Sequence, residues 1–283
     1  MVIPPTVYKR PDPLIYSQSY LMAQGLAVTW DNPDITLFRN NAPVPSSELL
    51  ADTDYDVRAT VWNGSTEAPA VNMPVDFSFL SFGIGTTSTI IGRTFVDLPV
   101  RGAVGHPATA ALIWRTPKVP GHYCLQVNLV WGDDANPANN LGQENTNVGV
   151  AHSPALFDFP VENRNDRPVT MTLSVDSYVP PAPIDCAKVF DGRVPSTVAG
   201  QVPTQRDLCV RLANRHNKDA FPIPEGWTVE IDPTTFSLAP GAGRVVTVRI
   251  TPPDSFTGIK AFNVNGIDER GTLVGGVTLY VQR

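Results

Sequence analysis

The densest set of side chains able to bind a metal lies between Gly132 and Glu144. It consists of Asp133, Asp134, Asn136, Asn139, Asn140 and Glu144. Ca²⁺ takes roughly six to eight oxygen ligands, which the carboxylates and amide carbonyls of one loop can supply. However, Pro137 stiffens this segment and the Asp-x-Asp-x-Asp-Gly spacing is absent, whereas Asp and Asn in loops commonly cap their own backbone. We therefore expect a self-capped turn and no cofactor, with a weak Ca²⁺ site at the first four of these residues as the alternative.

Residues suited to nucleophilic or acid–base catalysis form no recognisable motif. The histidines are scattered at His106, His122, His152 and His216. A Ser–His–acid triad needs its members in one pocket, and the chain has no G-x-S-x-G, H-E-x-x-H or P-loop motif. We expect Gly83–Thr87 to be a turn between strands, because no Lys follows it. The sequence predicts a protein that is not an enzyme, and a hydrolase would need perturbed acids gathered in one cleft.

The cysteines and tryptophans are candidates for a disulfide and a binding surface. Cys186 and Cys209 could form a disulfide that closes a loop, and Cys124 would then remain a free thiol. The alternative is that all three cysteines are reduced thiols. Exposed tryptophans could form a sugar-stacking platform, although most tryptophans in sandwiches pack in cores or between domains. Trp62 and Trp114 fall on the face opposite the most apolar register of their strands, so we expect both at a protein interface.

Alternation of apolar and polar residues predicts many short strands and few helices. His122–Val150 is expected to form a hairpin in which an Asx-rich turn separates the strands 123–129 and 145–150. With 30–38, 55–62, 73–80, 86–98 and 109–114, it completes seven strands in just over 100 residues, which is typical of an immunoglobulin-like sandwich. A second set of strands is expected at 156–161, 169–175, 208–212, 227–231, 236–241, 244–253, 260–264 and 272–281.

These patterns predict an all-β fold of two tandem immunoglobulin-like β-sandwiches with an extended N-terminal arm. The arm spans residues 1–33, the first sandwich 34–152 and the second 153–283, with a long Pro-rich insertion at about 176–206 that we expect to be functional or packed against another surface. The arm carries apolar and aromatic side chains that need a surface to cover. It either packs on its own domain or reaches a neighbouring subunit through the interface candidates Tyr16, Tyr20, Leu21 and Met22.

Composition excludes some classes of partner. The net charge is −6 with no basic block, so the attraction that drives nucleic-acid binding is missing. No apolar run approaches the roughly 20 residues that span a bilayer, and the N-terminus has no apolar stretch of the kind found in signal peptides. We expect a protein at the cell surface, outside the cell or on a particle.

Several motifs carry a resemblance to a known family. They are W-D-N-P-D-I at Trp30–Ile35, D-Y-D-V-R-A-T-V-W-N-G-S at Asp54–Ser65, W-R-T-P at Trp114–Pro117, P-G-H-Y-C-L at Pro120–Leu125 and D-A-N-P-A-N-N-L-G-Q-E-N at Asp134–Asn145. Over about residues 30–150 the chain resembles CARDB-like domains, the bacterial cell-adhesion-related immunoglobulin-like modules. Residues 215–283 resemble the immunoglobulin or fibronectin-type accessory domains of bacterial glycosidases and surface proteins. The resemblance implies adhesion, spacing or assembly and no catalytic residues.

The sequence therefore favours a non-catalytic structural or adhesion protein that contacts other proteins, mainly copies of itself, in a filament, surface layer or particle. One alternative is a carbohydrate-binding accessory module that uses Trp62 or Trp114. Another is a virion, phage-like or injection-particle decoration protein, which would explain the missing export signal.

Overall fold

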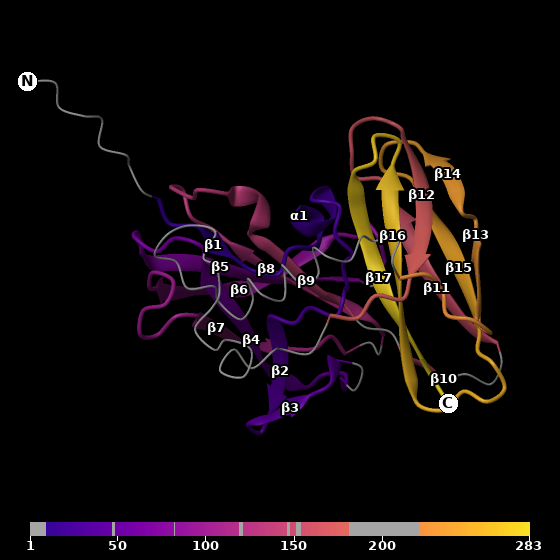
Figure 1. Ribbon diagram of the computed structural model, residues 1–283, viewed down its shortest axis with the longest axis horizontal. Helices are drawn as coiled ribbons and strands as arrows, with labels where there is room; N and C mark the ends of the chain where they lie inside the picture. The colour runs from indigo at the N-terminus through magenta and orange to yellow at the C-terminus, as the bar shows by residue number, and fades with distance from the viewer. Residues whose placement is uncertain are drawn as a thin grey trace, which may run out of the picture.

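The computed structural model describes residues 10–46, 49–81, 83–118, 121–145, 148–150, 154–180 and 221–283. The regular secondary structure of these residues is nearly all β-strand, and includes one short helix, α1 (Gln18–Ala23), and a 3₁₀ turn, η2 (Pro137–Asn139). Figure 1 shows two bodies of packed sheets, the first drawn in indigo to magenta and the second largely in orange and yellow. The predicted all-β immunoglobulin-like sandwich fold is confirmed. None of the described helices is long and apolar enough to cross a membrane.

The first sandwich packs two antiparallel sheets. The central strand of one is β4 (Asp54–Asn63), which pairs with β7 (Ala108–Arg115) on one side and with β2 (Ile35–Arg39) and β1 (Pro13–Leu14) on the other, while β3 (Ala42–Val44) pairs with β2. The other sheet has the order β6 (Ser88–Leu98), β5 (Ala70–Ser81), β8 (Tyr123–Leu129), β9 (Leu141–Asn145). The alternation seen in the sequence places Val57, Val75 and Val127 in the core between them.

The second sandwich also has two sheets. One has the order β11 (Ala155–Glu162), β15 (Gly243–Thr251), β13 (Thr228–Asp232). The other has the order β10 (Val148–Val150), β17 (Leu273–Gln282), β16 (Ile259–Asp268), β12 (Val169–Asp176), β14 (Thr235–Leu238). Phe159, Val248 and Val264 are among the residues buried between these sheets.

One predicted strand is wrong in its boundaries and in its partner. The strand that returns against β8 is β9, which ends at Asn145, because the Asx-rich turn closes at Asn140, whose carbonyl accepts a hydrogen bond from Leu129 N (3.0 Å). Residues 148–150 form β10 and pair in parallel with β17 of the second sandwich. Cys186, Cys209, the predicted strand 208–212 and most of the insertion at 176–206 lie outside the described residues.

The described part of the arm packs on its own chain and is not extended throughout. It contains β1 and α1, and Ile15 and Val28 are buried. Tyr16 and Leu21 are buried in one cluster, with Tyr20 and Met22 packed against it. The prediction that Tyr16 and Leu21 contact a neighbouring subunit is therefore wrong, because the chain itself covers both (7% and 6% exposed).

Candidate functional site

Trp30 joins the two sandwiches where the arm reaches β2. Its indole Nε1 donates to Asn265 Oδ1 of β16 (3.0 Å), and its backbone N–H donates to Thr278 Oγ1 of β17 (2.9 Å). The indole lies against Gly276, where any Cβ would overlap the ring. Trp30 is only 2% exposed, so this tryptophan packs between domains.

Two side-chain amides form hydrogen bonds with backbone groups at the edges of sheets, where a neighbouring strand would otherwise bind. Asn145, at the end of β9, donates to Gly276 O (2.9 Å) and accepts from Thr278 N (3.1 Å) on β17. Gln18 of α1 donates to Gln143 O (2.6 Å) and accepts from Gln143 N (3.2 Å) on β9. A carboxamide carries one acceptor and two donors, so it can satisfy both backbone groups as a neighbouring strand would.

The β5–β6 loop inserts Ile84 into the second core, where it is 1% exposed. Its N–H donates to Pro160 O (2.9 Å) and its carbonyl accepts from Glu162 N (2.8 Å). A side chain at Gly83 or Gly85 would collide with the carbonyl oxygens of Pro160 and Glu162. The segment expected to be a simple turn between strands therefore also docks the two sandwiches.

A satisfied polar network lies behind this junction. The buried Asp176 carboxylate accepts from Asn263 Nδ2 (2.8 Å), Asn265 Nδ2 (2.9 Å) and Tyr178 N (2.9 Å). Thr278 Oγ1 in turn donates to Asn263 Oδ1 (2.8 Å). Burial raises the pKa of Asp176 from its ordinary value, while these hydrogen bonds to the carboxylate oppose the rise.

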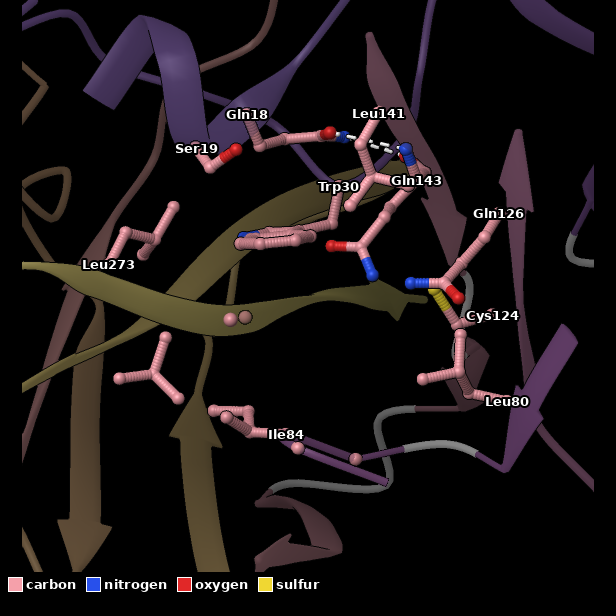
Figure 2. Close-up of a pocket in the computed structure, with 15 residues that line it drawn as sticks. Gln18, Ser19, Trp30, Leu80, Ile84, Cys124, Gln126, Leu141, Gln143 and Leu273 are labelled. Atoms are coloured by element: carbon pink, nitrogen blue, oxygen red, sulfur yellow. Dashed lines mark hydrogen bonds between the residues drawn. The ribbon is translucent and has the colours of Figure 1, made fainter. Parts of the chain in front are cut away.

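A cavity of about 220 Å³ opens where the outer face of β8 and β9 meets α1 and β17 (Figure 2). Its lining consists of Gln18, Ser19, Trp30, Leu80, Gly83, Ile84, Gly85, Cys124, Gln126, Leu141, Gln143, Leu273, Val274, Gly275 and Gly276. None of these described lining residues is an Asp, Glu, Lys, Arg or His. Burial raises the pKa of the Cys124 thiol, so this side chain stays protonated and uncharged. The cavity thus presents amides, a hydroxyl and apolar side chains, without a base or an activated nucleophile among them.

A larger cleft of about 500 Å³ lies beside β2 and β17 and contains two carboxyl groups. Glu144 is 3% exposed and accepts a hydrogen bond from Asn32 N. Asp31 is hydrogen-bonded to Glu144 and accepts a second hydrogen bond from Tyr280 Oη. Burial first, and then the charge of Asp31, raise the pKa of Glu144 well above its ordinary value. The carboxyl groups of Asp31 and Glu144 are hydrogen-bonded to each other. The two catalytic carboxyl groups of glycosidases lie farther apart, at roughly 5 Å or more.

The two tryptophans predicted at an interface lie in different environments. Trp114 is 2% exposed and packs beside Phe79 in the first core (ring centroids 5.6 Å apart), so its predicted exposure is wrong. Ala110 and Trp114 face inward and Ile113 outward, which is the opposite of the register expected for β7. Trp62 is partly buried, and its Nε1 donates to Asp34 Oδ1 (3.0 Å). A sugar platform built on Trp114 is thus excluded.

The Asx-rich loop caps itself, as expected. Asp134 accepts from Asn136 N (2.8 Å) and Asn140 Nδ2 (2.7 Å), and Asp133 forms an ion pair with Arg10 (2.9 Å). Asn139 donates to the Asp12 carboxylate (3.2 Å) and keeps a buried amide oxygen without a partner among the described residues. Across the part of the chain that the structure describes, no three His, Cys, Asp or Glu side chains gather as a metal site.

Comparison with known proteins adds fold-level likeness only. No protein-family model matches the chain, and no curated protein matches it in sequence. Solved structures similar to it include Escherichia coli alpha-2-macroglobulin activated by porcine elastase (TM-score 0.27, 7% identity). That match covers 88% of this chain and 22% of the macroglobulin. A putative membrane-anchored protein from Corynebacterium diphtheriae (TM-score 0.25, 12% identity) is matched over 88% of this chain and 59% of that one.

The fibronectin(III)-like modules of Clostridium thermocellum CbhA (TM-score 0.22, 12% identity) are matched over 88% of this chain and 93% of theirs. The chain thus spans about a fifth of the macroglobulin and nearly all of the CbhA modules. With TM-scores this low, none of these proteins indicates a function. The class that the strands themselves define is an all-β protein built from immunoglobulin-like sandwiches.

Proposed function

We propose that this chain is a non-catalytic structural or adhesion protein that makes protein–protein contacts in a repeated assembly at a cell surface or on a particle. The observation that carries the proposal is a group of exposed apolar side chains on neighbouring strands of the first sandwich. Val71 of β5 (62% exposed) and Ile90 (82%) and Phe95 (54%) of β6 belong to it. Large apolar side chains that gather on an exposed surface are typical of interaction sites.

These residues lie on two neighbouring strands of one sheet. β6 pairs with β5 antiparallel, with Phe95 opposite Pro74 and Ile90 opposite Ser78, and with register shifts between Ala70 and Met73 and between Phe77 and Ser78. Ile113 is exposed on β7, which belongs to the other sheet of this sandwich, so it is not part of this group. Val71, Ile90 and Phe95 are therefore exposed on two neighbouring strands of one sheet.

The sequence of β6 favours a second copy of the chain as the partner. Arg93, Phe95 and Asp97 all point outward from the sheet. If two copies met in antiparallel orientation about a two-fold axis at Phe95, Arg93 of each would lie opposite Asp97 of the other. Opposite charges and paired aromatic rings at such positions stabilise cross-strand contacts, and a surface complementary to itself is what a two-fold dimer requires.

The rigidity of the junction supports a role in assembly. Trp30 and Ile84 cross from one sandwich to the other as buried side chains, and Asn145 bonds β17 from the end of β9. A unit fixed in this way holds its two ends at a constant separation, which a repeating filament or particle lattice needs.

Light scattering coupled to size-exclusion chromatography, with negative-stain microscopy, tests the proposal. We expect the intact chain to form oligomers whose mass rises with concentration, and Phe95→Lys to shift it to monomers. Leu156→Lys on β11 is the matched control, because Leu156 is exposed to a similar extent (56%) on the second sandwich. An intact chain that is monomeric at every concentration contradicts self-assembly, and oligomers unaffected by Phe95→Lys contradict the β6 surface.

A further inference from the structure

The cavity at the corner of the two sandwiches has polar groups directed into it that the fold does not use. Gln126 of β8 and Gln143 of β9 are neighbours in the sheet and extend toward the same space (Figure 2). Gln126 Oε1 accepts from Ser78 Oγ (3.3 Å), and its Nε2 has no hydrogen-bond partner among the residues that the structure describes. The side-chain amide of Gln143 has no hydrogen-bond partner among the described residues, since only its backbone bonds Gln18.

We propose that this cavity binds one neutral monosaccharide unit, held by the amides of Gln126 and Gln143. A carboxamide offers a donor and an acceptor in a fixed planar arrangement, which matches a pair of adjacent hydroxyl groups on a sugar ring. The hydroxyl of Ser19, at the start of α1, shares a hydrogen bond with Ser17 Oγ (3.4 Å) and can make one more with a ligand. This proposal is independent of the assembly proposed above, because it rests on a different surface of the chain.

The charge of the lining selects a neutral ligand. Its described residues include no Asp, Glu, Lys, Arg or His, and the Cys124 thiol is protonated. A charged group brought into this cavity would lose its hydration without gaining a counter-ion, which is strongly unfavourable. Acidic sugars such as glucuronate should therefore bind less well than neutral hexoses.

The shape and stiffness of the cavity fit a single ring. A volume of about 220 Å³ is several times the roughly 30 Å³ that one water takes up in the liquid, which leaves room for one sugar ring. Leu80 and Ile84 line one side and Leu273 another (Figure 2), so the C–H faces of a ring would meet apolar carbon. The junction at Trp30 fixes these walls before a ligand arrives, and preorganisation of this kind favours binding.

The test uses the full-length chain and a panel of methyl glycosides of neutral hexoses, with methyl glucuronide as the charged comparison. Saturation-transfer NMR and titration should detect at least one neutral glycoside. Gln143→Ala should weaken its binding about fivefold to tenfold, the size expected for losing one or two hydrogen bonds. Leu273→Trp should abolish binding by filling the cavity. Asn128→Ala is the control, because Asn128 is exposed on the same face of β8 but does not line the cavity.

The fold of each variant is checked by thermal melting. Gln143→Ala keeps the backbone hydrogen bonds to Gln18, so its melting temperature should stay close to that of the parent chain. The proposal is overturned if no neutral glycoside binds at concentrations up to about 10 mM. It is also overturned if a bound glycoside is unaffected by both Gln143→Ala and Leu273→Trp, or if the glucuronide binds best.

Discussion

The contact that joins the two sandwiches most directly is the insertion of Ile84 into the second core. Ile84 belongs to a loop of the first sandwich, yet it is 1% exposed among the residues of the second core. Gly266 of β16 and Gly275 of β17 leave room for it, since a Cβ at either would lie 3.2 Å from its side chain. Truncation of this one side chain should therefore destabilise a domain to which it does not belong in sequence.

The magnitude follows from the atoms removed. Ile84→Ala deletes three buried carbon atoms, which at about 0.8 kcal/mol each gives about 2.4 kcal/mol. The cavity left behind adds to this loss, because the glycine-lined walls carry no side chains that could relax into it. We expect the free energy of unfolding to fall by about 3 kcal/mol, within the range of about 2–5 kcal/mol seen for buried Ile→Ala substitutions.

Urea unfolding followed by far-UV circular dichroism and tryptophan fluorescence measures this loss. The matched control is Ile113→Ala, because Ile113 is 62% exposed on β7 and should change stability by no more than about 0.5 kcal/mol. The unfolding curves from the two probes should coincide for the parent chain. They should separate for Ile84→Ala, because the two sandwiches are then less tightly coupled. A loss no larger than that of Ile113→Ala would refute the assignment of Ile84 as a docking residue.

Two further predictions concern the junction. The pKa of Glu144 is raised in the folded chain above its ordinary value of 4.5. Above pH 4.5 the folded state therefore binds more protons than the unfolded state. The free energy of unfolding should then fall with rising pH, by up to about 1.4 kcal/mol per pH unit. Glu144→Gln should flatten this slope in thermal melts from about pH 4 to about pH 8, whereas Glu230→Gln on the exposed face of β13 should not; equal slopes in all three chains would contradict the assignment. Deletion of residues 1–30 should prevent stable folding, because Ile15, Val28 and Trp30 are buried; a cooperative melt at the parental temperature would contradict the packing of the arm.

The strands were largely predictable because alternation is a local property. The pattern over 55–62 became β4 and that over 244–253 became β15, each with small shifts at its ends. The hairpin between β2 and β3 was missed, although Asn40 and Asn41 turn the chain with positive φ angles of 52° and 61°. Consecutive Asn residues tolerate this conformation, so that signal was present in the sequence.

The side of a strand that faces the core was less predictable. On β7 both faces carry apolar residues, with Ala111 and Ile113 on one and Ala110 and Trp114 on the other. Alternation separates the two faces but does not say which is covered, and the larger area of Trp114 decided the outcome. The partners of Glu144 could not be predicted either, because Tyr280 and Asp31 are brought together only by the packing of two domains and the arm.

The sealed sheet edges also bear on how copies of this chain could meet. Gln18 occupies backbone groups at the edge of β9, and Asn145 does the same for β17. A strand added by another copy at these positions would have to displace an amide that already donates and accepts. β6, by contrast, ends its sheet within the described residues and exposes Ile90 and Phe95. If copies of the chain assemble as proposed, the side-chain amides at the junction would therefore direct assembly away from the junction and toward the β6 surface.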